Sequence, residues 1–175
     1  MGQHPFLLRS VFGMAPHASQ EAVDSIGLVR SQALSLPTEN GRIRISLNMG
    51  LCASPRNPAL FILLEEGGIS HVVCSWDDIF RTAKAMANLG WTPLPISPNY
   101  YLDLQARFGL GAEALKKMKQ FGILYDADIS GGEFFHFFTA TVEDDLHFEI
   151  VQRIGGYEGF GEVNSAARIS AQLQS

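Results

Sequence analysis

The clearest pattern of hydrophobic and polar positions lies between Leu146 and Arg153, where apolar and polar side chains alternate among aromatic and β-branched residues. A Gly-Gly pair follows at 155–156, and an alternating run bounded by glycine predicts a β-strand. Because successive side chains of a strand point to opposite faces, His147 and Glu149 lie on one face. The opposite face consists of Leu146, Phe148 and Ile150 and is predicted to pack on the core.

Glu149 is the residue of this strand that requires an explanation. A carboxylate on a largely apolar strand is costly to bury unless it is paired or binds a metal. The residues alone leave two interpretations open, because Glu149 either pairs with Arg153 or faces solvent, or it is a metal ligand. A second candidate ligand lies upstream, where a short apolar strand carries His71 and Asp77-Asp78 then caps a helix.

Further patterns predict the remaining elements. Residues 27–36 and 42–48 are predicted to form a hairpin, because Asn40-Gly41 between them is a strong turn signal. Residues 14–26 are predicted to be a loop. Helical spacing and glycine stops predict helices over residues 6–12, 59–66, 77–89, 100–108, 112–121 and 164–174, and further strands cover residues 123–126 and 133–139.

The order of these elements is weakly repeated along the chain. A helix, a hairpin and a connector are followed by a strand, helices and three strands, which predicts an α/β fold of the α+β kind with two βαβββ modules. The first module, residues 1–66, includes the connector and lacks its opening strand. The second, residues 67–175, ends in a helix. If the turn between the last two predicted strands lies near Asp144, antiparallel pairing of those strands places His136 nearly opposite Glu149.

Composition narrows the class of protein. With 175 residues, 46% hydrophobic and 18% charged, the chain can bury a core. A net charge of -5 gives no basic surface for nucleic acid. No apolar run approaches the roughly 20 residues that cross a bilayer, and the N-terminus has no signal-peptide pattern. Cys52 and Cys74 make no disulfide framework, so we expect reduced thiols in a cytoplasmic protein.

Two motifs of the second module carry a resemblance to a known family. One is Gly-Ile-Ser-His-Val-Val at 68–73, followed by Asp-Asp-Ile at 77–79. The other is Phe-Glu-Ile-Val-Gln-Arg at 148–153, followed by Gly-Gly-Tyr-Glu-Gly-Phe-Gly at 155–161. Together they resemble 4-hydroxyphenylpyruvate dioxygenase and, more closely, the dioxygenase-like C-terminal domain of bifunctional 3-dehydroshikimate dehydratases. Both belong to the vicinal oxygen chelate superfamily, and the resemblance extends from about residue 6 to the C-terminus.

The resemblance implies a vicinal oxygen chelate fold, in which paired βαβββ modules form a cupped sheet. It also implies that His71 and Glu149 are metal ligands, while the family's other ligand lies on the opening strand that this chain lacks. Two His and one carboxylate with open positions suit non-haem Fe(II) and oxygen chemistry. The expected metal is Fe(II), with Co, Mn, Mg or Zn as alternatives. The expected reaction is dioxygenation of a small aromatic or keto-acid substrate.

Further residues of the chain extend this interpretation. His147 is either a third ligand beside His71 and Glu149 or a histidine packed among phenylalanines. His136 stands where the dioxygenases carry a Gln and the dehydratase-type domains a His, so it is expected to support Glu149 or to replace a ligand. By position in Val-Arg-Ser and Ser-Leu-Asn, Ser31 and Asn48 match the family's substrate-side residues.

The sequence also departs from the dioxygenases at two places. Asn57 stands in place of a Gln before the connector helix, and the segment after the Gly-Phe-Gly turn begins at Asn164 and has no Phe. Three hypotheses remain open: a metal-dependent dioxygenase, an accessory domain of a dehydratase whose chemistry lies in a barrel domain, and a binding module without turnover. Expected partners are an upstream barrel domain or a second copy of the chain at an exposed sheet edge.

Overall fold

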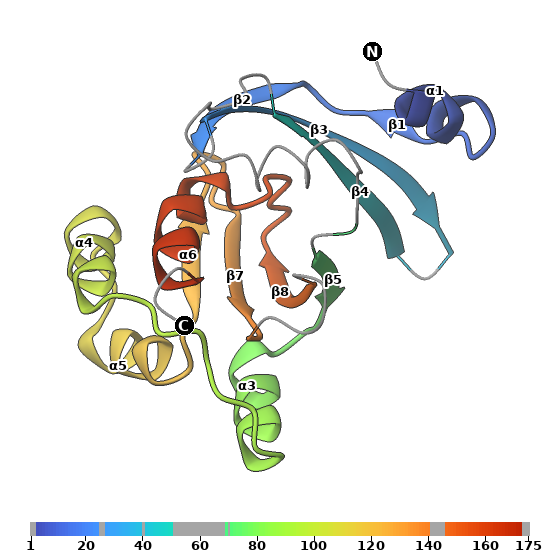
Figure 1. The fold of residues 1–175 in the computed structure, drawn as a ribbon. Coiled ribbons are helices and arrows are strands. Elements are labelled where there is room, and N and C mark those ends of the chain that lie inside the picture. The colour runs from blue at the N-terminus through green and yellow to red at the C-terminus, as the bar shows by residue number, and fades with distance from the viewer. Residues whose placement is uncertain are drawn as a thin grey trace. The chain divides into compact units, whose positions relative to one another are not determined.

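The computed structural model describes residues 3–24, 27–39, 41–50, 69, 71–140 and 146–172. The chain divides into two compact units, residues 1–68 and residues 69–175, and each is described by itself (Figure 1). The predicted helix over 59–66, together with Cys52 and Asn57, lies outside the described residues. None of the described helices is long and apolar enough to cross a membrane.

The first unit consists of one helix and an antiparallel sheet built around its longest strand. Strand β3 pairs with β1 and β2 through its two halves and with β4 along nearly its whole length. The pairing of β3 with β4 confirms the predicted hairpin and sets Ser31 opposite Asn48. The elements are α1 (Gln3–Ser10), β1 (Ala15–Pro16), β2 (Gln20–Asp24), β3 (Gly27–Thr38) and β4 (Gly41–Gly50).

The loop predicted for residues 14–26 is wrong, because β1 and β2 lie within it. The segment Gln20–Asp24 has no apolar–polar alternation that would predict a strand. It is a strand because β3 presents backbone donors and acceptors along a second edge, and pairing with that edge satisfies both chains. Tertiary pairing, not local propensity, makes this strand.

The second unit has the predicted βαβββ order and is extended by a C-terminal helix. Its sheet has the strand order β5-β8-β7-β6, in which β5 runs parallel to β8 and the other pairs are antiparallel. Such a parallel pair requires a long crossover, which the three helices after β5 provide. The elements are β5 (His71–Ser75), α3 (Ile79–Asn88), α4 (Pro98–Phe108), α5 (Ala112–Gln120), β6 (Leu124–Ala127), β7 (Glu133–Phe138), β8 (His147–Ile154), η2 (Glu162–Asn164) and α6 (Ser165–Gln172).

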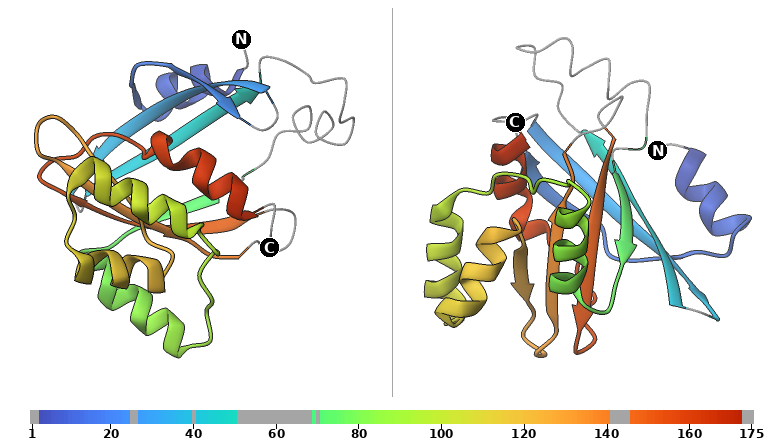
Figure 2. Two further views of the ribbon diagram at one scale, coloured as in Figure 1. Left: turned by 90° about the vertical axis from the view of Figure 1, so that its left-hand side faces the viewer. Right: turned by 90° about the horizontal axis from the view of Figure 1, so that it is seen from below.

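Most of the core of this unit lies on one face of the sheet, and a smaller buried cluster of Phe134, Val151 and Tyr157 includes strand residues of the other face. The predicted cap of α3 is present, because the Asp78 carboxylate accepts a hydrogen bond from the backbone N–H of Arg81 at 2.9 Å. The helices bury their apolar faces against alternate strand residues, and their arrangement can be followed in Figure 2. The buried residues on this face include Ile79 and Ala83 of α3, Leu104 of α4, Met118 of α5, Tyr125 of β6, Phe137 of β7 and Ile150 of β8.

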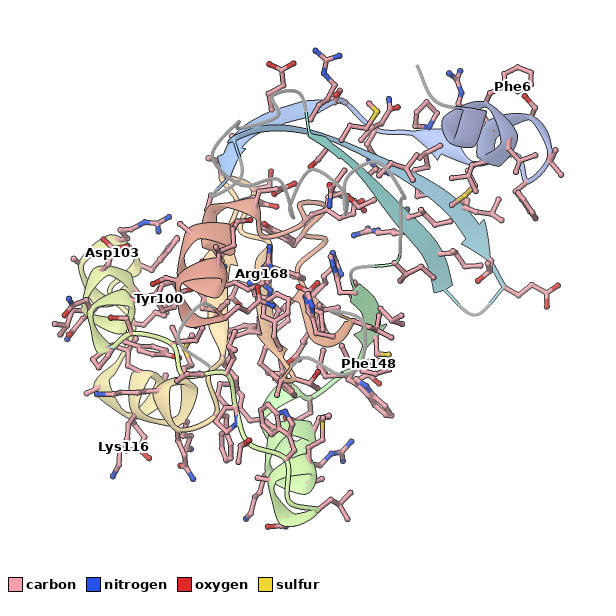
Figure 3. All side chains as sticks on the ribbon, in the orientation of Figure 1. Phe6, Tyr100, Asp103, Lys116, Phe148 and Arg168 are labelled. Atoms are coloured by element: carbon pink, nitrogen blue, oxygen red, sulfur yellow. The ribbon has the colours of Figure 1, made fainter. Side chains whose placement is uncertain are left out.

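Phe148 does not follow the prediction for its face. The alternation of β8 assigns it to the core with Ile150, yet it is 38% exposed, whereas Ile150 is buried. Phe148 pairs with Val72 of the edge strand β5, and Val72 is itself 39% exposed (Figure 3). The core prediction for Phe148 is therefore wrong, because this end of the face borders the sheet edge.

Candidate metal centre

Strand register gathers the predicted ligands on the face of the second sheet opposite the helical core. The parallel pairing of β5 with β8 sets His71 opposite His147, and Glu149 follows two residues later on the same face. The antiparallel pairing of β7 with β8 sets His136 opposite Val151. Three neighbouring strands thus bring four polar side chains together, and His136, His147 and Glu149 are buried among them.

Glu149 is at the centre of this group. Its Oε1 lies 2.7 Å from Nδ1 of His136, and its Oε2 lies 3.4 Å from Nε2 of His71. The side chain of His71 keeps 26% of its surface exposed, against 3% for His136 and 8% for Glu149. The Oε1 side of the carboxylate is therefore buried, whereas His71, which lies beside Oε2, is partly exposed. We call the side of Oε2 and His71 the accessible side.

Glu149 is ionised despite its burial. Burial by itself raises the pKa of the carboxyl group, but the interactions with His136 and then His71 outweigh it and lower the pKa to about 2. A buried carboxylate that keeps its charge over the physiological pH range is suited to binding a cation. The first interpretation of Glu149 from the sequence, pairing with Arg153, does not describe its contacts, because its carboxylate oxygens lie next to the two histidines.

His136 uses both of its ring nitrogens within the protein. While Nδ1 meets Glu149, Nε2 lies 2.9 Å from Nδ2 of Asn164, which is itself buried. A histidine bound on both sides has no lone pair directed at a metal, so this geometry favours the supporting role predicted for His136. Sequence reasoning did not predict Asn164 as a partner. Its position after a glycine-rich turn gave no signal beyond the missing aromatic residue.

His147 lies next to His71 but in a different relation to Glu149. Its ring is stacked on the His71 ring, with centroids 5.2 Å apart and an angle of 15° between the planes, and it meets the edge of Phe138 at 5.6 Å. Within the described ranges, no group of three His, Cys, Asp or Glu side chains is arranged to hold a metal ion. The arrangement resembles the packed histidine of the second interpretation, and the ligand role of His147 stays a prediction.

The donors that remain fit a divalent cation. His71 and Glu149 offer one imidazole nitrogen and one carboxylate oxygen from adjacent strands, and this donor pair suits Fe(II), Co(II), Mn(II) or Zn(II). The supporting hydrogen bond from His136 is of the kind that orients a metal-binding carboxylate.

Ser31 and Asn48 meet in the first unit. They are opposite each other on β3 and β4, and the Ser31 hydroxyl donates a hydrogen bond to Oδ1 of Asn48 at 2.6 Å. The structure thus brings together the two residues predicted to contact substrate. Their role in binding stays a prediction.

Comparison with known proteins shows which proteins this chain resembles. No family model matches the chain. It is 38% identical over 171 residues to 3-dehydroshikimate dehydratase of Pseudomonas putida, which covers 95% of this chain and 26% of that protein. It is 30% identical over 138 residues to 4-hydroxyphenylpyruvate dioxygenase of Pseudomonas aeruginosa, covering 78% of this chain and 38% of the relative. The chain is thus similar to 3-dehydroshikimate dehydratases and to 4-hydroxyphenylpyruvate dioxygenases over most of its own length.

Solved structures agree with this similarity. A fusion of a xylose isomerase-like TIM barrel with 4-hydroxyphenylpyruvate dioxygenase matches 96% of this chain, with a TM-score of 0.73 and 33% identity. A 4-hydroxymandelate synthase variant from Streptomyces coelicolor matches 95% of it, with a TM-score of 0.73 and 22% identity, which is a likeness of fold. The fold is therefore the α+β vicinal oxygen chelate fold that the sequence predicts. The chain spans about a quarter of the length of the dehydratase relatives, 26% in each case.

Proposed function

We propose that this chain is a metal-dependent dioxygenase-type domain in which His71 and Glu149 are two of the ligands to Fe(II). The observation that carries the proposal is the buried, ionised Glu149, with one oxygen held by His136 and the other beside His71 on the accessible side. When bound, Fe(II) with histidine and carboxylate ligands and open positions supplies oxygen chemistry on a chelating substrate. Similarity to the dioxygenases supports the same chemistry.

The residues of this chain have separate tasks in the proposal. Glu149 provides the negative charge and His71 the neutral nitrogen donor. His136 fixes the direction of the carboxylate, and His147 packs against His71 and limits the movement of its ring. The third ligand comes from a segment outside the described residues. The substrate is a small aromatic or keto acid. A role of Ser31 and Asn48 in binding it is a separate proposal for the first unit.

A metal analysis tests the assignment of Glu149. Protein at equilibrium with Fe(II) in anaerobic dialysis is analysed for bound metal, as the parent chain and as Glu149→Ala. We expect the variant to lose the bound metal while its fold persists, because the carboxylate is the charged ligand. Glu113→Ala is the control, since Glu113 is a carboxylate on α5 whose side chain is 77% exposed. Equal metal content in parent and Glu149→Ala contradicts the assignment.

A second function has a specific observation in its favour. The similarity to 3-dehydroshikimate dehydratases covers 95% of this chain, and the matched solved structure is a fusion with a TIM barrel. The alternative proposal is that this chain is an accessory domain without oxygenase turnover, joined to a barrel domain that performs the dehydration. A barrel-coding region directly upstream in the genome, with dehydration unaffected by Glu149→Ala in the joined protein, would favour this alternative.

A further inference from the structure

A chain of buried polar groups lies behind Glu149, on the side away from His71. It runs from the hydroxyl of Tyr100 on α4, through the amide of Asn164 in η2, to the imidazole of His136 on β7 and then to the carboxylate. Asn164 and His136 are among the most buried polar residues described, with 1% and 2% of their surface exposed. Figure 3 labels Tyr100, which reaches Asn164 just before α6 begins.

The direction of each hydrogen bond follows from the backbone of Tyr125. The carbonyl oxygen of Tyr125 lies 3.1 Å from one end of the Asn164 amide, and a carbonyl only accepts, so that end is the NH₂ group. The backbone N–H of Tyr125 donates to the Tyr100 hydroxyl at 2.8 Å. The hydroxyl in turn donates to Oδ1 of Asn164 at 2.9 Å, and its oxygen also lies 3.2 Å from the Tyr125 carbonyl. These contacts fix the orientation of the amide.

The fixed amide determines where His136 carries its proton. The second N–H of Asn164 points at Nε2 of His136 at 2.9 Å, so Nε2 must accept. Its other nitrogen, Nδ1, then carries the hydrogen and donates it to Oε1 of Glu149 at 2.7 Å. If the proton were on Nε2, two donors would face each other at Asn164 and two lone pairs would face each other at Glu149. Buried groups without a matching partner are costly, so one tautomer is selected.

We propose that Asn164, with its amide held by Tyr100, is a positioning residue that keeps His136 in the Nδ1–H tautomer and thereby fixes Glu149. The carboxylate is then bound at Oε1 and presents Oε2 on the side of His71. The tautomer of His136 is a property of the metal-free protein. The statement that Oε2 is presented to a metal rests on the proposed function.

Nuclear magnetic resonance of the metal-free chain tests the tautomer directly. The nitrogen shifts of the imidazole rings are recorded for the parent, and His136→Gln identifies the signals of His136 among the five histidines of the chain. We expect the parent to show Nδ1–H and a bare Nε2. In Asn164→Asp, which has the same shape but an acceptor in place of the donor, we expect Nε2 to gain a proton. An Nε2–H tautomer in the parent overturns the proposal, whether or not the variant folds.

Titration with Co(II) tests the consequence for the metal. His136→Ala and Asn164→Asp are expected to weaken Co(II) binding by about 10- to 100-fold, the usual effect of losing a supporting partner of a ligand. His136→Gln is expected to retain affinity within about tenfold of the parent, because its amide can still donate to Oε1. Equal affinity of parent and His136→Ala contradicts the positioning role. If the parent binds no Co(II), the proposed function fails while the tautomer result stands.

Discussion

At the scale of single residues, the charge of Glu149 is determined by the two histidines beside it. Glu149 is 6% exposed, yet it is held as an anion by two histidines from the strands on either side of β8. The face that carries it could be predicted from the alternation of β8. The predicted place of His136, nearly opposite Glu149, is two residues off, because His136 pairs with Val151 and Phe138 pairs with Glu149. Tyr100 and Asn164 could not be predicted, because their contact spans 64 residues of sequence and depends on how the crossover helices pack.

The lowered pKa of Glu149 predicts how stability depends on pH. Its pKa is about 2 in the folded protein, whereas an unperturbed glutamate, as in the unfolded chain, has a pKa of 4.5. Its contribution to the free energy of unfolding is therefore fully present above pH 4.5. The contribution is lost as the pH falls from 4.5 toward 2. We expect the difference in that free energy between the parent and Glu149→Gln to shrink by about 2 kcal/mol between pH 5 and pH 3.

Urea unfolding of the metal-free protein measures this difference. Both tryptophans of the chain, Trp76 and Trp91, lie in the second unit, so their fluorescence reports the unit that contains Glu149. Asp103→Asn is the control, since the Asp103 side chain is 58% exposed. A difference that stays constant between pH 5 and pH 3 would show that the two histidines do not hold the carboxylate ionised.

At the scale of elements, strands were predictable where side chains alternate and were missed where backbone pairing alone makes them. The strand β8 and the hairpin of β3 and β4 follow from their patterns, whereas β2 exists because β3 offers it an edge. The glycine-rich turn before η2 was noticed in the sequence as a family motif. Its physical role appears only in the structure, where Gly161 packs against the residues behind Glu149.

Substitution of Gly161 tests the role of this turn. Gly161 has a φ of +68°, and a Cβ there would lie 2.6 Å from Cε1 of Phe134 and 3.2 Å from Cε1 of His136. Gly161→Ala is expected to lower the free energy of unfolding by more than the roughly 1–3 kcal/mol of backbone strain alone. Gly109→Ala is the matched control, because Gly109 has a φ of +63° and nothing within 4 Å of the added Cβ. Equal losses measured by urea unfolding would mean that the contact with Phe134 and His136 is unimportant.

At the scale of the whole molecule, similarity to the dioxygenases and the dehydratases does not decide which reaction the chain performs. The chain matches 38% of the length of the Pseudomonas aeruginosa dioxygenase and 26% of the Pseudomonas putida dehydratase. The fold was predictable because strand order and helix order follow from local patterns and from two motifs. The full ligand set was not, since no group of three His, Cys, Asp or Glu side chains in the described part of the chain is arranged to hold a metal ion.

We expect this chain by itself to form no homogentisate from 4-hydroxyphenylpyruvate. The described residues contain no group of three side chains arranged to hold a metal ion, Asn57 stands where the resemblance places a Gln, and the segment from Asn164 onward carries no Phe. Oxygen uptake with added Fe(II) and this substrate provides the measurement, with the Pseudomonas aeruginosa dioxygenase as the positive control. Uptake in proportion to the substrate consumed would refute the expectation.

Calorimetric titration of Co(II) into this chain tests the central claim, that His71 and Glu149 form a metal site whose third ligand lies elsewhere. The account predicts weak binding that Glu149→Ala abolishes and His147→Phe leaves nearly unchanged. Tight binding by the present chain that is lost in His147→Phe, or binding that survives Glu149→Ala, would contradict the account.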